Sequence, residues 1–181
     1  MENPTLEQLK YPIGKFETPS IYTKEILEKA IQTIANFPDK LKKEVEKLTI
    51  DQLETPYRPD GWTIRQVVHH CADSHMNCFI RLKWALTEDN PTIKFYYENL
   101  WAEGTDNKTM PIEPTLQFLE GLHYRLAFVM KNLTENELEK TFIHPEHGKQ
   151  FQLKEIICMY AWHCNHHLAH ITELKKRMNW D

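Results

Sequence analysis

The chain has 181 residues, of which 41% are hydrophobic and 27% are charged, and its net charge is −4. This length and composition predict a single globular domain that spans residues 1–181 and encloses one core. The negative charge argues against nucleic acid as a partner, because phosphate binding needs a concentrated basic surface.

Neither a targeting signal nor a membrane span is predicted. Residues 1–10 lack the basic region and apolar run of a secretory signal. No window approaches the roughly 18 uninterrupted apolar residues that a membrane span needs. The four cysteines form no Cys-x-x-Cys pair, and in a chain without a signal they are expected to be reduced thiols in the core. We therefore expect a cytoplasmic protein with no membrane partner.

The first predicted helix covers about residues 23–48 and follows an N-terminal extension. Its apolar residues recur at helical spacing. Pro38 lies inside it and should kink or break it, because proline removes a backbone donor and clashes with the preceding turn. We expect the extension, residues 1–20, to pack on the body of the domain.

The second predicted helix has the clearest start in the sequence. Thr63 and Gln66 have the spacing of a capping box, and apolar residues then recur at helical spacing to about Thr87. The next stretch, residues 88–111, is predicted to be a loop. It is rich in aromatic residues, so we expect it to pack back on the body.

Two more helices complete the predicted fold. The third begins near Pro114, a residue favoured in the first turn, and continues to about Asn132. The fourth covers about residues 153–178. Four amphipathic helices without strand partners predict an all-α protein with the architecture of a four-helix bundle.

The last predicted helix contains four histidines in the run His163-Cys-Asn-His166-His167-Leu-Ala-His170. Two pairs have the spacing i, i+4, which stacks both imidazoles on one helix face, close enough to share a metal ion. The apolar stripe includes His167 and borders on His163, whereas His166 and His170 turn toward the polar side. Periodicity therefore favours His163 and His167 as the inward pair, whose lone pairs a metal ion would satisfy.

A third ligand would have to come from another helix, since catalytic zinc usually takes three protein ligands and keeps one position open. The second helix offers His69, His70 and His75. His75 lies near the centre of the apolar stripe and is predicted to be a hydrogen-bonded core histidine. His69 and His70 flank the stripe on opposite sides, and periodicity does not choose between them.

Five segments form a combination that is more specific than any one of them. They are Tyr11-Pro-Ile-Gly14, Thr55-Pro-Tyr-Arg58, Gly61-Trp-Thr-Ile-Arg-Gln-Val-Val-His-His70, Ala72-Asp-Ser-His-Met-Asn77, and Trp162-His163 with His167-Leu-Ala-His170-Ile-Thr-Glu-Leu174. Together they resemble the YfiT type of the DinB superfamily, from about residue 11 to the end of the chain. The resemblance implies a DinB-like four-helix bundle that forms a homodimer.

The resemblance also implies a three-histidine metal site, usually assigned to zinc and sometimes found with nickel or another divalent ion. In the family pattern the first ligand lies eight residues after the tryptophan that precedes the second helix, which is His70 here. The other two open and close the His-x-x-x-His stretch of the last helix, which gives His163 and His167. Many relatives carry glutamine three residues after the last ligand, and this chain has His170 there. Whether His170 supports a ligand without binding the metal itself is left open.

Three neutral imidazoles leave a metal ion its full charge and a position for water, and zinc so bound lowers the pKa of that water to about 7. The same ion could instead deprotonate a thiol. The resemblance implies a metal-dependent hydrolase of a small molecule, with a thiol S-transferase using a low-molecular-weight thiol such as bacillithiol as the alternative. The third interpretation is a non-catalytic binding module held by the metal, although structural zinc normally has four protein ligands.

Hydrolysis also needs a general acid or base near the metal. Asp73, three residues after His70, could be that base or could orient a ligand imidazole. Glu173, six residues after His167, is a second candidate, and either could instead be a solvated helix charge. Cys164 is next to a ligand, but adjacent helical residues point about 100° apart, so we expect it to pack in the core.

Overall fold

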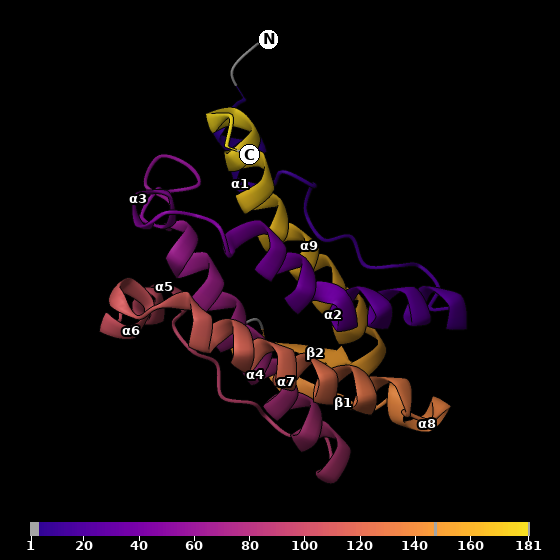
Figure 1. The fold of residues 1–181 in the computed structure, drawn as a ribbon. Helices are drawn as coiled ribbons and strands as arrows, with labels where there is room; N and C mark the ends of the chain where they lie inside the picture. The colour runs from indigo at the N-terminus through magenta and orange to yellow at the C-terminus, as the bar shows by residue number, and fades with distance from the viewer. Residues whose placement is uncertain (1–3, 147, 181) are drawn as a thin grey trace.

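The computed structural model describes residues 4–146 and 148–180, and four long helices make up most of this part of the chain (Figure 1). They are α2 (Lys24–Val45), α4 (Ile64–Thr87), α7 (Ile112–Lys131) and α9 (Leu153–Met178). Short helices lie in the connections: α1 (Leu6–Lys10), α3 (Ile50–Leu53), α5 (Glu98–Ala102), α6 (Thr105–Thr109) and α8 (Glu135–Leu138). The predicted four-helix bundle is confirmed.

The four long helices do not follow one another around the bundle. α2 packs against α7 and α9, and α4 packs against the same two helices, so α2 and α4 occupy opposite corners. α4 and α9 are therefore neighbours in space, although α7 and its connections separate them in the sequence (Figure 1). Fully buried side chains from all four helices fill the centre, among them Ile34, Phe37, Ile64, Leu82, Leu119, Leu126 and Ile157.

The start of α4 is the one that the sequence predicts. The Thr63 hydroxyl accepts a hydrogen bond from the Gln66 backbone N–H at 3.2 Å, and the Gln66 side chain accepts one from the Thr63 N–H at 2.9 Å. This capping box satisfies two amide donors that have no partner inside the helix. It fixes where the turns of α4 begin and hence which face each histidine of α4 occupies.

Of the kink or break predicted at Pro38, the break does not occur, since α2 runs without interruption from Lys24 to Val45. The missing N–H of Pro38 leaves the carbonyl of Ile34, four residues earlier, without its usual helical partner. The imidazole of His123 on α7 donates to that carbonyl from Nδ1 at 2.7 Å. Pro38 itself is buried, and burial of its ring helps to offset the local cost.

Residues 88–111 were predicted to be an aromatic-rich loop that packs back on the body. The stretch does pack back, but it does so through two short helices that were not predicted, α5 and α6, both of which pack on α4. An antiparallel hairpin of β1 (Thr141–His144) and β2 (Lys149–Gln152) was also not predicted. Ile93 extends the pairing by donating its N–H to the carbonyl of Ile143 at 3.0 Å. These elements have four or five residues each, too few to show a periodicity.

Among the described residues, no helix combines the length and the apolar character that crossing a membrane requires.

Candidate metal centre

The structure brings together the three histidines that were predicted as ligands. His70 comes from α4, and His163 and His167 come from the facing side of α9. The ring centroid of His70 lies 5.5 Å from that of His163 and 4.7 Å from that of His167, and the centroids of the two α9 rings are 4.4 Å apart. One nitrogen of each ring lies within 4.8 Å of the other two. Three nitrogen donors thus converge from two helices.

All three imidazoles are uncharged near neutral pH. Burial, together with repulsion from the neighbouring His166, lowers the pKa of His70 to about 3. Burial, followed by repulsion from the surrounding imidazoles, also holds the pKa values of His163 and His167 well below the ordinary 6.5. Neutral imidazoles offer a lone pair each, which is the form that binds a metal ion.

The donor set fits a divalent metal ion with nitrogen ligands. In a tetrahedral zinc site with Zn–N bonds of about 2.05 Å, ligand nitrogens lie roughly 3.3 Å apart. The nitrogens of these rings already lie within 4.8 Å of one another, so a small inward movement of the side chains would bring them to that spacing. Nδ1 of His167 is buried and makes no hydrogen bond within the described part of the chain. A cluster of buried lone pairs with few protein donors is the environment that a cation stabilises.

Two other groups of potential ligands lie close by, and both fit a metal less well. One is His75, His123 and Cys164, but hydrogen bonds already occupy all four ring nitrogens of these two histidines, and burial holds the pKa of the thiol well above 9. The other is His166, His167 and His170, whose Nδ1 atoms are all buried without a hydrogen bond among the described residues. Two of these three are adjacent residues of α9, which point about 100° apart, and Nε2 of His170 is already bonded to the carbonyl of Lys10 at 3.0 Å.

The choice between His69 and His70, which periodicity left open, follows from the helix that each one faces. His69 points toward α7 and the end of α6, where its ring bonds to the Thr115 hydroxyl of α7 at 2.8 Å and to the carbonyl of Met110, just after α6, at 3.1 Å. His70 points toward α9, and the Trp62 ring packs against it at a centroid distance of 4.5 Å. His69 therefore ties helices together, and His70 belongs to the cluster.

The expectation that His166 and His170 turn toward the polar side is wrong, because both side chains are buried. The N-terminal segment covers this face of α9: Tyr11 lies 5.8 Å from the ring of His166. Tyr57, from the connection before α4, stacks on His170 at 3.9 Å. Helical periodicity detects the face that meets the bundle core, and it carries no information about a face covered by a distant segment.

Comparison with known proteins identifies the family of this chain. The model of the DinB superfamily matches residues 34–171. The chain belongs to the DinB superfamily. It is 49% identical over 175 residues to a protein of Bacillus mycoides (strain KBAB4) named "Putative metal-dependent hydrolase", a match that covers 97% of this chain and 100% of the relative. A protein of Bacillus cereus (strain 03BB102) with the same description is 50% identical over the same length and coverage.

A solved structure of a similar protein has the same fold. YfiT from Bacillus subtilis aligns with a TM-score of 0.94 and 45% sequence identity, over 96% of this chain and 99% of YfiT. That protein is described as "a probable metal-dependent hydrolase with an unusual four-helix bundle topology". The resemblance that the sequence motifs indicated is confirmed.

Asp73, the predicted acid or base of this DinB-superfamily chain, is half-buried on α4. Its carboxylate accepts a hydrogen bond from the Asn107 side chain of α6 at 3.1 Å, and burial raises its pKa. Ser74 follows it, and the Ser74 hydroxyl lies 3.4 Å from Nε2 of His163. Ser74 was not predicted as a site residue, although its spacing of four from His70 puts both residues on one face of α4.

The remaining candidates have structural roles. Glu173 pairs with Lys176 at 2.7 Å on the outside of α9, as expected of a solvated helix charge. Cys164 is buried and packs beside His75, with 4.0 Å between its sulfur and Nε2 of that ring.

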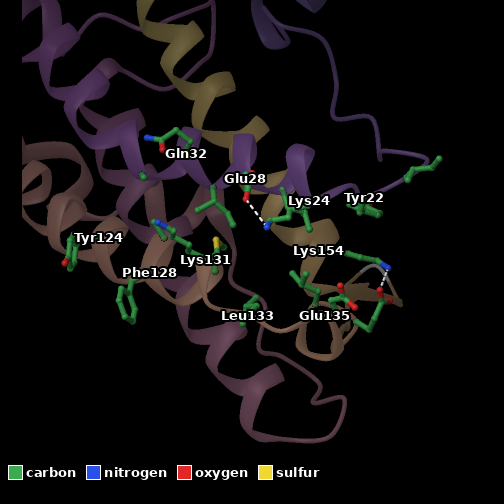
Figure 2. Close-up of a pocket in the computed structure, with 18 of the residues that line it drawn as sticks. Tyr22, Lys24, Glu28, Gln32, Tyr124, Phe128, Lys131, Leu133, Glu135 and Lys154 are labelled. Carbon is green, nitrogen blue, oxygen red and sulfur yellow. Dashed lines mark hydrogen bonds and ion pairs between the residues drawn. The ribbon is translucent and has the colours of Figure 1, made fainter.

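A wide groove lies elsewhere on the molecule, between α2, α7 and α8 (Figure 2). It has a volume of about 1470 Å³, and its walls include Gln32, Tyr124 and Phe128. No described histidine lines it. The groove is therefore separate from the histidine cluster, which lies at the contact between α4 and α9.

Proposed function

We propose that this chain is a metal-dependent hydrolase in which His70, His163 and His167 hold one divalent ion. The observation that supports the proposal is the convergence of three buried, uncharged imidazoles from α4 and α9. The names of the two Bacillus relatives and the description of YfiT agree with it. Zinc is our first choice of ion, because three imidazoles with an open fourth position are typical of catalytic zinc sites, with nickel as the next choice.

An ion in this site would act as a Lewis acid and lower the pKa of a bound water to about 7. The residues of the chain set the conditions for that chemistry. The three imidazoles are neutral, so the site keeps the full charge of the ion. The Trp62 ring covers His70 and keeps solvent away from that ligand. The half-buried carboxylate of Asp73, whose pKa burial raises, is the group that we propose to accept and return a proton.

Metal analysis tests the ligand set directly. Protein purified without a histidine tag is expected to contain about one divalent ion per chain, and His167→Ala is expected to abolish binding. His166→Ala is the matched control, since it removes the adjacent buried imidazole and is expected to leave binding intact. Loss of metal in His166→Ala together with retention in His70→Ala would show that the ion sits in the all-α9 cluster instead.

An activity screen tests the reaction class. Metal-loaded protein is incubated with generic ester and amide substrates and, in parallel, with monochlorobimane plus bacillithiol, cysteine or glutathione. Metal-dependent hydrolysis supports the proposal. Metal-dependent thiol conjugation without hydrolysis would replace it with the thiol S-transferase. Absence of both reactions in stoichiometrically loaded protein would favour the binding module held by its metal.

A further inference from the structure

A chain of hydrogen bonds leads from the proposed metal ligand His163 through the core to a backbone carbonyl. Nδ1 of His163 lies 3.0 Å from Nε2 of His75. Nδ1 of His75 lies 2.7 Å from Nε2 of His123, and Nδ1 of His123 lies 2.7 Å from the carbonyl oxygen of Ile34. His75 and His123 have no exposed surface. The chain passes through α9, α4, α7 and α2 in turn, so each long helix of the bundle contributes one member.

Pro38 explains why the chain can end on α2. In a regular helix the N–H of residue 38 would bond to the carbonyl of Ile34, but proline has no N–H. The carbonyl is therefore available inside the core, where an unpaired polar group is costly. His123 satisfies it. A carbonyl oxygen only accepts hydrogen bonds, so this contact requires a hydrogen on Nδ1 of His123.

That requirement also fixes which nitrogen carries the hydrogen in the rings of His75 and His163. A neutral imidazole carries one N–H, so with Nδ1 of His123 protonated its Nε2 must accept, and the hydrogen of the next contact belongs to Nδ1 of His75. By the same step Nε2 of His75 accepts from Nδ1 of His163. The three contacts hold three hydrogens, which is the number that three neutral rings supply. The reverse order would place the lone pair of His123 against the carbonyl oxygen at 2.7 Å, with two acceptors in contact.

We propose that His75 and His123 are positioning residues that hold His163 as its Nδ1–H tautomer and so present its Nε2 lone pair to the metal, with the Ile34 carbonyl setting the direction of the relay. This inference rests on the proposed metal site. The Ser74 hydroxyl lies 3.4 Å from Nε2 of His163, the geometry of a donor facing that lone pair. The relay also holds the His163 ring at a fixed angle, which is how partners behind a ligand raise metal affinity.

Nitrogen-15 NMR of the imidazoles in metal-free wild-type protein tests the relay without any variant. His75, His123 and His163 are each expected to show a protonated Nδ1 and an unprotonated Nε2. An Nε2–H tautomer at His123 or His75 would overturn the relay. This readout does not depend on bound metal, so its failure differs from failure of the proposed function, which wild-type protein that takes up no metal would show. That second result would also remove the proposed purpose of the relay.

Metal affinity, measured by competition with a chromophoric chelator, tests the consequence. His75→Leu removes the acceptor behind His163 and is expected to weaken zinc binding 10–100-fold. His75→Gln places an amide oxygen near the position of Nε2 and is expected to restore most of the affinity. Equal affinity of His75→Leu and wild type would overturn the positioning role, as would equal losses in the leucine and glutamine variants.

Phe37→Leu is the control for packing. The Phe37 ring lies 5.3 Å from the rings of both His75 and His123, so this change disturbs the surroundings of the relay while its hydrogen bonds remain. Its zinc affinity is expected to stay within about threefold of the wild type. A loss as large as that of His75→Leu would show that packing alone accounts for the effect.

Discussion

Acid is expected to unfold the metal-free protein because its core contains neutral histidines. Burial lowers the pKa of His123 to about 4 and that of His70 to about 3, whereas both would titrate near 6.5 in the unfolded chain. As the pH falls below 6.5, the unfolded chain therefore binds more protons than the folded chain does. These two residues contribute stability that is complete above that pH and is lost progressively as the pH falls toward 4 and 3.

The size of the effect follows from the two pKa values. At pH 5 each of the two histidines is expected to reduce the free energy of unfolding by about 2 kcal/mol, or about 4 kcal/mol together. A domain is typically stable by about 5–15 kcal/mol, so this is a large share of the total. The pKa values of His75, His163 and His167 are lowered in the same direction and add to the loss. Unfolding is therefore expected between about pH 6 and pH 4.

Guanidinium denaturation of chelator-treated protein, followed by circular dichroism at pH 8, 7, 6 and 5, measures this loss. Below pH 6 the free energy of unfolding is expected to fall by at least about 2.7 kcal/mol per pH unit, which corresponds to two protons. His123→Gln removes one of them and is expected to reduce the slope by about 1.4 kcal/mol per pH unit. A free energy of unfolding that stays constant from pH 7 to pH 5 would refute the reasoning, since it would mean that these imidazoles are not buried and neutral.

The remaining predictions concern the metal, the proton-transfer group and the start of α4. A divalent ion at about 100 times its Kd is expected to add about 2.7 kcal/mol of stability, seen as a rise in Tm of about 5–10 °C that His70→Ala abolishes. Asp73→Asn is expected to keep the metal content of the wild type and to lower hydrolysis about 100-fold or more; unchanged turnover would exclude Asp73. Thr63→Ala removes half of the capping box and is expected to cost about 1 kcal/mol in denaturant titration, and no loss would show that the cap is dispensable.

The long helices could be predicted because each has one continuous apolar face. α9 begins and ends where the periodicity places it, and the capping box locates the start of α4. The short elements could not be predicted. α5, α6 and the two strands of the hairpin have four or five residues each. The contacts that stabilise them are with distant parts of the chain, such as the hydrogen bond between Ile93 and Ile143.

The histidines show the same limit at the level of single residues. Periodicity placed His163 and His167 on the inner face of their helix, and the structure brings both to His70. It could not separate His70 from His69, because both are buried and they differ only in the neighbouring helix that each one faces. It misplaced His166, because the segment that covers it lies about 150 residues earlier in the chain, where Tyr11 packs against its ring.

Pro38 is a case where a local rule predicted a kink or a break, and the break does not occur for a reason that concerns the site. The rule is that proline leaves a helical carbonyl unpaired, and this holds for Ile34; the helix persists because His123 satisfies that carbonyl from another helix. Sliding α4 by one turn, about 5.4 Å, would separate His75 from both of its partners and leave buried nitrogens without hydrogen bonds. Alternative packings of the four amphipathic helices are disfavoured for that reason, even where their apolar contacts would be equally good. The residues that hold His163 toward the metal position therefore also favour one alignment of the bundle, and that alignment brings His70 opposite His163 and His167.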